Sequence, residues 1–266
     1  MTEIRGAVAV VTGAANGIGR ASALSLAARG ARLVLVDIDA ALLDEVGQTI
    51  QDAGGEALVL PLDLSREDAF GDMRTATLDR FGTVDIVMNN VGVLVCGLPQ
   101  DIPLAEWERV INLNLMGVIR SIHQFLPDFV VKGSGHFVNT ASFAGLFPYA
   151  FDRLPYAATK GAIVTMTEGL ALYLRPQGIG VTLLCPGPVK TAIGKTMRSF
   201  TDGLALRGPG AQFTMVEAEA VGEMVADAIR DNRFFLPTDD QVRDLMARRS
   251  ADVDAFLYGQ MDALQS

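Results

Sequence analysis

Short apolar runs alternate along the chain with longer segments in which apolar and polar positions are mixed. Seven runs rich in Val, Leu, Ile or Phe occupy residues 7–12, 32–37, 57–63, 84–90, 135–141, 180–185 and 233–237. Their near-continuous apolar character is typical of strands that are covered on both faces. The segments between them are long enough for helices over residues 17–29, 39–53, 66–81, 103–131 and 156–175. This alternation predicts an α/β fold with one doubly wound parallel sheet of about seven strands and helices on both faces.

No linker rich in Pro or Ser and no charge block divides the sequence, so residues 1–266 are expected to form a single domain. Within it, residues 192–215 are interrupted by glycines and by Pro209, a composition that suggests a mobile lid. Residues 238–266 are expected to form a helical tail, whose apolar side chains can pack on the same subunit or on a neighbour.

The charge balance restricts the possible partners. The chain has 22 Lys and Arg against 31 Asp and Glu, a formal net charge of -9, whereas nucleic acid or anionic lipid requires a concentrated basic surface. No apolar run reaches the roughly 18 to 20 residues of a spanning helix, and Cys96 and Cys185 lie in apolar stretches typical of buried free thiols. We therefore expect a cytoplasmic protein with a small-molecule partner, no membrane and no nucleic acid. His123 and His136 lack metal-ligand spacing, so no metal site is expected.

A glycine-rich turn, "TGAANGIG" over residues 12–19, follows the first predicted strand and opens the first predicted helix. Gly13 can form the sharp turn, Gly17 allows a pyrophosphate to approach the backbone, and Gly19 allows close packing of helix on strand. The N-terminus of the helix attracts negative charge. The position of this turn between strand and helix indicates a dinucleotide-binding site.

The second predicted strand ends at Asp37, eighteen positions beyond Gly19. A dinucleotide-binding fold places at about this distance the carboxylate that hydrogen-bonds the adenosine ribose. Such a carboxylate repels a 2′-phosphate, and neither Ala15 nor Ile38 offers a compensating cation. The sequence therefore predicts NAD rather than NADP as the cofactor. An ordinary turn aspartate is the alternative, and Asp39 is expected to cap the next helix.

"YAATK", residues 156–160, places Tyr156 and Lys160 on one face of a predicted helix. In isolation this spacing is typical of a solvated helix face, and Ser142 and Asn114 alone would indicate a turn residue and a buried hydrogen-bonding residue. These residues occur, however, together with "TGAANGIG", "NNVG" (89–92), "NLMG" (114–117), "NTASFAG" and "PGPVKT" (186–191). In this order and spacing the chain resembles the short-chain dehydrogenase/reductase family from about residue 4 to residue 191. "NNVG" departs from the usual Asn-Asn-Ala-Gly by one small apolar residue.

The resemblance implies a Rossmann-type fold and hydride transfer between NAD(H) and an alcohol or ketone, with Tyr156 as general acid or base. A free tyrosine has a pKa near 10, and lowering it by about three units requires roughly 4 kcal/mol. The expectation is that the ammonium group of Lys160 supplies much of this energy and that an oxidised nicotinamide adds a second positive charge. By the family's pattern Lys160 also holds the nicotinamide ribose, Ser142 orients the substrate oxygen, and Asn114 lies in a helix kink that holds a relay water.

The same alignment implies further cofactor contacts, with Asp63 and Leu64 at the adenine, Asn90 near the adenosine ribose, and Val189 and Thr191 at the carboxamide. Asp63 is equally consistent with a cap of a helix beginning near Ser65. The complete implied cofactor set is Gly13, Asn16, Gly17, Ile18, Gly19, Asp37, Asp63, Leu64, Asn90, Tyr156, Lys160, Val189 and Thr191.

The segments that match the family's substrate pocket are largely apolar and favour a hydrophobic or aromatic substrate. They carry four aromatic residues: Phe143, Phe147, Tyr149 and Phe151. Phe143 and Phe147 are equally consistent with packing under the loop. Arg153 is consistent either with contact to a substrate carboxylate or with exposure to solvent. An NADP-linked reductase of a carrier-bound keto acid and a non-catalytic nucleotide-sensing regulator remain alternatives. By resemblance, a homodimer or homotetramer is expected.

Overall fold

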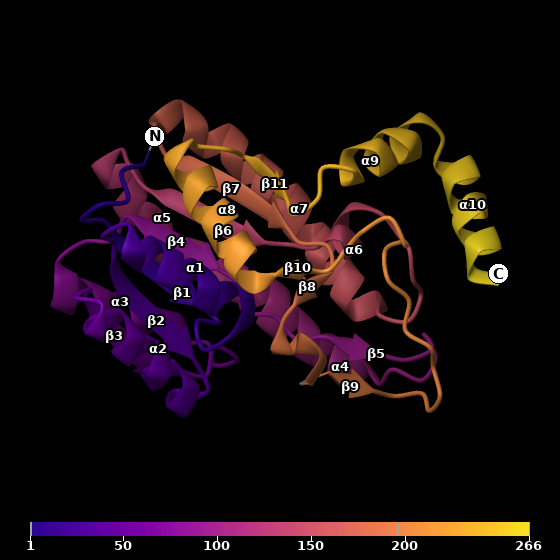
Figure 1. Cartoon of the computed structure of the whole chain (residues 1–266), viewed down its shortest axis with the longest axis horizontal. Helices are drawn as coiled ribbons and strands as arrows, with labels where there is room; N and C mark the ends of the chain where they lie inside the picture. Colours follow the sequence, from indigo (N-terminus) through magenta and orange to yellow (C-terminus); the bar gives the residue numbers. More distant parts are fainter. Residues whose placement is uncertain (1, 196, 266) are drawn as a thin grey trace.

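The computed structural model describes residues 2–195 and 197–265, so residues 1, 196 and 266 of the predicted domain, lid and tail lie outside the described part. Seven parallel strands form the central sheet in the order β11-β7-β6-β4-β1-β2-β3. Helices cover both faces of this sheet (Figure 1). The predicted α/β fold with a doubly wound parallel sheet is confirmed.

The strands of this sheet are short, as their apolar runs predict. They are β1 (Val8–Thr12), β2 (Arg32–Asp37), β3 (Ala57–Pro61), β4 (Ile86–Asn89), β6 (His136–Thr140), β7 (Gly180–Cys185) and β11 (Phe235–Pro237). The strand order reverses beside β1, because the chain moves outward through β2 and β3 and then returns to β4 on the other side of β1. Ligands of doubly wound sheets bind at the carboxyl ends of strands at such a reversal.

The helices follow the predicted segments closely. They are α1 (Gly17–Ala28), α2 (Ala40–Asp52), α3 (Ala69–Phe81), α4 (Leu104–Val110), α5 (Gly117–Lys132), α6 (Phe143–Leu146), α7 (Leu154–Leu174), α8 (Ala218–Arg230), α9 (Val242–Ala251) and α10 (Val253–Gln265), with 3-10 turns at Arg175–Gln177 and Ala192–Lys195. Asp39 caps α2 as expected, because its Oδ1 accepts a hydrogen bond from the Leu42 N–H at 3.1 Å. The helix predicted over 66–81 begins three residues later, at Ala69.

Alternate residues of β1 explain why both faces of the sheet must be covered. Val8 and Val10 pack with apolar residues of α3, α5 and α7, whereas Ala9 and Val11 pack with those of α1, α2 and α8. Because successive side chains of a strand point to opposite faces, a strand that is apolar throughout requires helices on both sides. All four side chains are fully buried.

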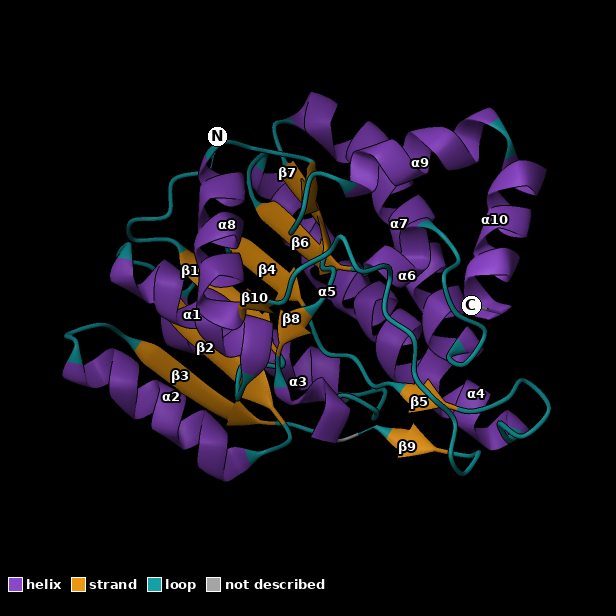
Figure 2. Ribbon diagram, turned by 45° about the vertical axis from the view of Figure 1, so that its right-hand side comes forward, coloured by secondary structure: helices purple, strands orange, loops and turns teal. Residues whose placement is uncertain are grey.

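Two small sheets lie outside the central one (Figure 2). β5 (Val95–Cys96) pairs with β9 (Arg198–Ser199), and β8 (Val189–Lys190) pairs with β10 (Val216–Glu217). β9 lies within residues 192–215, the predicted lid, and β8 and β10 flank that segment on either side.

The helices α9 and α10 extend from one end of the molecule (Figure 1). The ring of Phe256 on α10 meets that of Phe147 edge-on, with 6.2 Å between centroids. Leu245 on α9 is buried, whereas Met261 on α10 is half exposed. The tail therefore packs in part on its own subunit.

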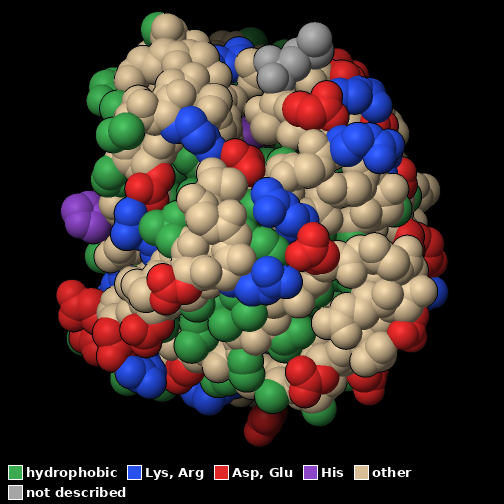
Figure 3. Space-filling view, turned by 90° about the vertical axis from the view of Figure 1, so that its left-hand side faces the viewer, with side chains coloured by type: hydrophobic (Ala, Val, Ile, Leu, Met, Phe, Trp, Pro, Cys, Tyr) green, Lys and Arg blue, Asp and Glu red, His purple; other side chains and the backbone are tan. Residues whose placement is uncertain are grey.

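Acidic and basic side chains are interspersed on the face of the molecule shown in Figure 3, where the basic ones lie beside acidic ones. No described helix is long and apolar enough to cross a membrane. Cys96 and Cys185 are both buried and free, as predicted.

Candidate active site

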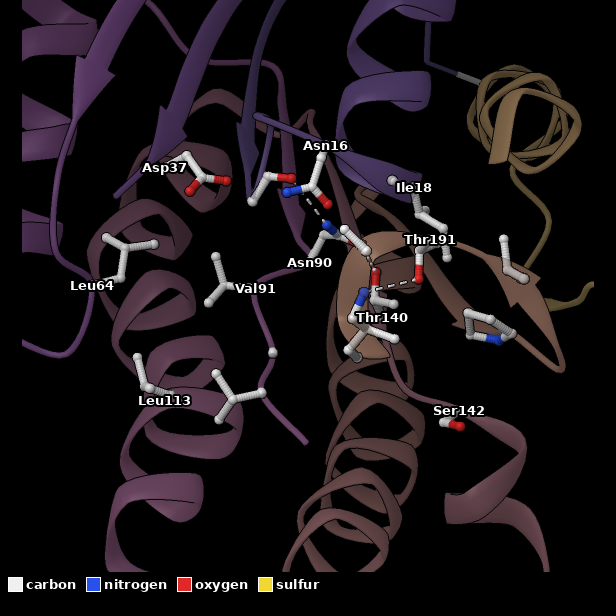
Figure 4. Close-up of a pocket in the computed structure, with 18 of the residues that line it drawn as sticks. Asn16, Ile18, Asp37, Leu64, Asn90, Val91, Leu113, Thr140, Ser142 and Thr191 are labelled. Atoms are coloured by element: carbon white, nitrogen blue, oxygen red, sulfur yellow. Dashed lines mark hydrogen bonds between the residues drawn. The ribbon is translucent and has the colours of Figure 1, made fainter. Parts of the chain in front are cut away.

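A cavity of about 430 Å³ opens at the carboxyl ends of β1, β2, β4 and β6 (Figure 4). Thirteen of the fifteen residues predicted to act in catalysis or cofactor binding line it: Gly13, Asn16, Gly17, Ile18, Asp37, Asp63, Leu64, Asn90, Ser142, Tyr156, Lys160, Val189 and Thr191. The other two, Gly19 and Asn114, lie just behind its wall. Figure 4 shows Asp37 at one end and Ser142 at the other, so the cavity is elongated.

The glycine turn is closely packed at each of its three glycines. Gly13 has φ +69°, and a Cβ there would lie 2.9 Å from Nδ2 of Asn90. Gly17 has φ +55° and faces Thr191, while a Cβ on Gly19 would lie 2.0 Å from the carbonyl oxygen of Gly13. Side chains are therefore excluded from the turn, and its backbone forms the cavity wall.

Asp37 shapes the turn as well as lining the cavity. Its Oδ2 accepts a hydrogen bond from the Ala15 N–H, and its Oδ1 accepts one from the Asp39 N–H, each at 3.1 Å. Asp37 can therefore act both as a turn aspartate and as the carboxylate expected to bind the adenosine ribose. Lys160 is the only Lys or Arg among the described residues that line the cavity. The exposed side chain beside Asp37 is Ile38, which carries no charge.

Asp63 closes a local turn at the end of β3. Its Oδ1 accepts a hydrogen bond from the Ser65 N–H at 2.9 Å, and hydrogen bonds from Ser65 hold the pKa of this carboxyl below its usual value. Because α3 begins only at Ala69, Asp63 does not cap a helix near Ser65, and that alternative is wrong.

Asn90 joins the ends of three neighbouring strands. Its Nδ2 donates to the carbonyl oxygen of Thr12 at 3.3 Å, its N–H donates to Oγ1 of Thr12 at 3.0 Å, and its Oδ1 accepts from Oγ1 of Thr140 at 3.3 Å. β1, β4 and β6 are thus held in register at the floor of the cavity. Thr140 was not anticipated, although it lies in the predicted strand 135–141 and within "NTASFAG".

Asn114 lies in a π-helical segment, Ile111–Met116, between α4 and α5. Its side chain is fully buried. Oδ1 accepts a hydrogen bond from the Val93 N–H at 2.8 Å, and Nδ2 donates to the Val93 carbonyl at 3.0 Å and to Oγ1 of Thr159 at 3.3 Å. π-Bulges occur often at functional sites. This one directs an amide toward the loop that follows β4.

Lys160 is almost completely buried, with 3% of its surface exposed. Its Nζ donates to the carbonyl oxygen of Thr140 at 2.7 Å. Burial disfavours the ammonium form and lowers the pKa of Lys160 to about 8. A Cβ on Gly92 would lie 3.4 Å from Nζ of Lys160 and 3.6 Å from Oδ1 of Asn114. Gly92 therefore leaves space between these two polar groups.

Tyr156 differs from expectation. Burial raises the pKa of its hydroxyl to about 12, and hydrogen bonding with Ser142 opposes this rise only in part. Nζ of Lys160 lies 5.6 Å from the centre of the Tyr156 ring and donates instead to Thr140. The protein's own groups therefore do not lower the pKa of Tyr156, and a lowering by Lys160 together with an oxidised nicotinamide stays a prediction.

The four aromatic residues expected in the substrate pocket do not line this cavity. Phe143 and Phe147 are buried beneath the loop, and Phe143 packs edge-on against Phe213 with 5.0 Å between ring centroids. Phe147 and Tyr149 face a second cavity of about 280 Å³ behind the loop, while Phe151 is partly exposed. Aliphatic residues such as Val93 and Ile193 line the cavity instead.

Arg153 is neither solvent-exposed nor available to a substrate carboxylate. Its Nε lies 2.5 Å from Oδ1 of Asp152, and both side chains are largely buried. Sequence reasoning did not single out Asp152, because an acidic residue beside an arginine on a loop is usually solvated.

Comparison with known proteins agrees with this geometry. A sequence profile described as short chain dehydrogenase matches residues 7–202. The chain is 35% identical over 191 residues to an uncharacterized oxidoreductase of Staphylococcus epidermidis, covering 72% of this chain and 81% of the relative. It is 29% identical to a CLA biosynthesis dehydrogenase/reductase of Lactiplantibacillus plantarum, over 94% of this chain and 93% of the relative.

Among solved structures, a short chain dehydrogenase/reductase from Burkholderia phymatum in complex with NAD is 31% identical, with a TM-score of 0.86 over 96% of both chains. A 3-ketoacyl-(acyl-carrier-protein) reductase from Brucella melitensis, complexed with NADH, is 29% identical, with a TM-score of 0.78 over 89% of this chain and 98% of that one. The chain belongs to the short-chain dehydrogenase/reductase family, and it is an oxidoreductase.

Proposed function

We propose that the protein transfers a hydride between NAD(H) and a hydrophobic secondary alcohol or ketone. The observation that carries this proposal is that Ser142, Tyr156 and Lys160 line the same cavity as Asp37 and the glycine turn. A dinucleotide site and a set of proton-transfer groups therefore share one space. The aliphatic wall around Val93 and Ile193 favours an apolar substrate.

The residues present fit a dinucleotide. Gly13, Gly17 and Gly19 form a cradle from which side chains are excluded, at the N-terminus of α1, where backbone N–H groups attract a pyrophosphate. Asp37 would accept hydrogen bonds from the adenosine ribose, and Lys160 would hold the second ribose. When bound, the nicotinamide supplies the carbon that accepts or donates the hydride.

The protein's own residues would handle the proton. With a pKa of about 12, Tyr156 keeps its proton at neutral pH, which suits its donation to a ketone oxygen. The hydroxyl of Ser142 would orient that oxygen. Lys160, buried and bonded to Thr140, would stabilise the phenolate left behind, and Asn114 would order the loop at Val93 beside it.

NAD is proposed over NADP because of the charge at Asp37. The cofactors in the similar structures do not decide the matter, since the Burkholderia protein was solved with NAD and a metagenomic short-chain oxidoreductase, 31% identical, with NADP. A 2′-phosphate beside Asp37 would meet a carboxylate and find no Lys or Arg among the described lining residues near it.

A second candidate function is reduction of a carrier-bound keto acid. The similarity to the Brucella 3-ketoacyl-(acyl-carrier-protein) reductase favours it. The net charge of -9 opposes it, because the chain would have to dock an acidic carrier.

A homo-oligomer is also proposed. The side chain of Val131 on α5 is 90% exposed and that of Leu172 on α7 is 81% exposed. A subunit contact over these helices would cover both. Sedimentation velocity would test this, and a monomer at micromolar concentration would oppose it.

The experiment that tests the proposed function follows NADH absorbance with aliphatic, aromatic, steroid-like and polyol alcohols and the matching ketones, using NAD(H) and NADP(H) in parallel. Tyr156→Phe keeps the ring but removes the transferable proton, so turnover should fall by about a hundredfold or more while NADH binding is retained. Tyr173→Phe, at a half-exposed position on the same helix, is the matched control. NADH binding without turnover of any substrate would favour a nucleotide-sensing regulator.

A further inference from the structure

Asp152 and Arg153, immediately before and at the start of α7, form a buried ion pair. Nε of Arg153 lies 2.5 Å from Oδ1 of Asp152, and its Nη2 lies 3.1 Å from Oδ2. The side chains of Asp152 and Arg153 are only 3% and 13% exposed. Removing two charges from water is unfavourable, so such a pair persists only where its geometry is good and its remaining polar atoms are satisfied.

Both residues of the pair also bind the backbone of Arg207, and the guanidinium of Arg153 lies over the Tyr149 ring, 5.6 Å from its centre. Oδ2 of Asp152 accepts a hydrogen bond from the Arg207 N–H at 3.3 Å, and Nη2 of Arg153 donates to the Arg207 carbonyl at 2.7 Å. The carbonyl of Asp152 accepts a further bond from the Gly97 N–H at 2.9 Å. The pair thus joins the segment around Arg207, the loop after β5 and the start of α7.

The segment that contains Arg207 is the described C-terminal part of the predicted lid, residues 197–215. Near its beginning the Phe200 N–H donates to the Cys96 carbonyl at 2.8 Å, and Arg198 forms an ion pair with Glu106 at 2.6 Å. Toward its end Phe213 packs on Phe143. Between these anchors the backbone forms neither helix nor strand, and the ion pair holds it at Arg207.

The ion pair is also connected to the residue proposed to transfer the proton. Arg153 lies three positions before Tyr156, and its carbonyl accepts the Ala157 N–H at 3.0 Å, which begins the hydrogen bonding of α7. At the N-terminal end of the predicted lid, Ala192 and Ile193 line the cavity that Tyr156 also lines. Arg153 therefore links the segment at Arg207 to the first turn of the helix that carries Tyr156.

We propose that the Asp152–Arg153 pair is a latch that holds residues 197–213 closed beside the Ser142–Tyr156 end of the cavity. The two residues are positioning residues, because they act through the backbone of Arg207 and the start of α7. Loss of either partner leaves the other charge buried and unpaired, which favours an open segment in which that charge regains water. The kinetic part of this inference rests on the proposed function, but the closure of the segment does not.

Two cysteines provide a measure of opening that is independent of activity. Cys96 lies in β5, which pairs with β9, is completely buried, and has its Sγ 3.3 Å from Sδ of Met197. Cys185 is completely buried in β7 of the central sheet. A thiol reagent should therefore reach Cys96 when residues 197–213 open, and Cys185 only when the core itself opens.

The experiment measures labelling of the full-length protein by the aromatic disulfide DTNB, resolved by peptide mass spectrometry for each cysteine. Asp152→Asn and Arg153→Gln should each speed labelling of Cys96 by about tenfold or more and leave that of Cys185 unchanged. The double variant should be no faster than the singles, because both changes remove the same interaction. Asp128→Asn, which breaks the Arg74 ion pair between α3 and α5, is the matched control and should change neither rate.

Unchanged Cys96 labelling in both latch variants would overturn the proposal. Equal acceleration at both cysteines would also overturn it, because the pair would then be a general stabiliser of the fold. Once a substrate is known, the latch variants should raise KM by several-fold with a smaller change in kcat, and Arg153→Lys should restore part of that difference. If no substrate is turned over, the proposed function fails while the labelling result still decides whether the latch exists.

Discussion

The side-chain amide of Asn114 pairs with both polar backbone groups of Val93, accepting from its N–H at 2.8 Å and donating to its carbonyl at 3.0 Å. Asn114 comes from a π-helical segment, whereas Val93 lies in the loop that leaves β4 toward the cavity. An amide is the smallest side chain that offers a donor and an acceptor in this geometry. The pair therefore fixes the loop at Val93, which lines the cavity.

Asn114→Ala should lower both stability and activity. It leaves the N–H and carbonyl of Val93 unpaired in a partly buried position, and the free energy of unfolding should fall by about 1 to 3 kcal/mol. Urea unfolding and NADH-coupled kinetics measure the two effects. Asn112→Ala is the control, because Asn112 lies in the same segment but bonds to Ser65 and Arg120, away from the cavity. An equal loss of activity in both variants would show that activity does not depend specifically on the contact between Asn114 and Val93.

Gly19→Ala should prevent a normal glycine turn. The added methyl group would lie 2.0 Å from the Gly13 carbonyl oxygen, a backbone atom that cannot move without opening the turn. We expect a loss of about 2 kcal/mol or more in unfolding free energy and weaker NADH binding by titration. Gly169→Ala on α7 meets nothing within 4 Å and should instead stabilise by about 0.5 to 1 kcal/mol. Normal NADH affinity in Gly19→Ala would contradict the proposed cofactor cradle.

Much of this architecture can be predicted from the sequence, because the apolar pattern of each segment agrees with its place in the fold. Continuously apolar runs such as residues 7–12 require cover on both faces, and a glycine turn after the first of them locates the carboxyl edge where Asp37, Asn90 and Ser142 meet. The exact ends of the helices were harder to predict. The helix predicted from residue 66 begins at Ala69, since Asp63 and Ser65 form a turn first.

The features missed from the sequence depend on tertiary contacts. The sign of the pKa shift of Tyr156 depends on how deeply the ring is buried and on the direction of Lys160, and spacing alone specifies neither. Similarly, "FDRLP" gives no indication that Asp152 and Arg153 are buried, because the segment that covers them is more than 40 residues away. The burial of this ion pair can be inferred only once the position of the segment around Arg207 is known.

Asp37→Asn should shift the cofactor preference toward NADPH. The asparagine keeps one oxygen that can accept from the Ala15 N–H and loses the exposed contact with the Asp39 N–H, so the glycine turn keeps its hydrogen bond while the charge that repels a 2′-phosphate is gone. We expect the ratio of kcat/KM for NADPH over NADH to rise about tenfold, equivalent to about 1.4 kcal/mol. Asp39→Asn, which keeps an acceptor for the cap of α2, should leave the ratio unchanged. A wild-type enzyme that already uses both cofactors equally would remove the basis of the NAD assignment.

His136 should make the fold sensitive to acid. It is completely buried on β6, where its Nδ1 contacts Oγ1 of Thr2 at 3.3 Å and its Nε2 contacts Oγ1 of Thr182 at 2.8 Å. Oγ1 of Thr182 donates to the Arg233 carbonyl, so it accepts from Nε2, and the neutral ring satisfies both contacts. Burial lowers the pKa of His136 to about 3 from an ordinary value of 6.5.

Because the unfolded chain protonates this histidine and the folded chain does not, stability is fully present above pH 6.5 and is lost as the pH falls toward 3. At about 1.4 kcal/mol per pH unit, His136 should contribute roughly 2 kcal/mol of destabilisation between pH 6.5 and pH 5. Urea unfolding across this range measures the slope. His136→Gln should flatten it whatever its effect at neutral pH, whereas His123→Gln, at an exposed position on α5, should not. An unchanged slope in His136→Gln would assign the acid sensitivity to other groups.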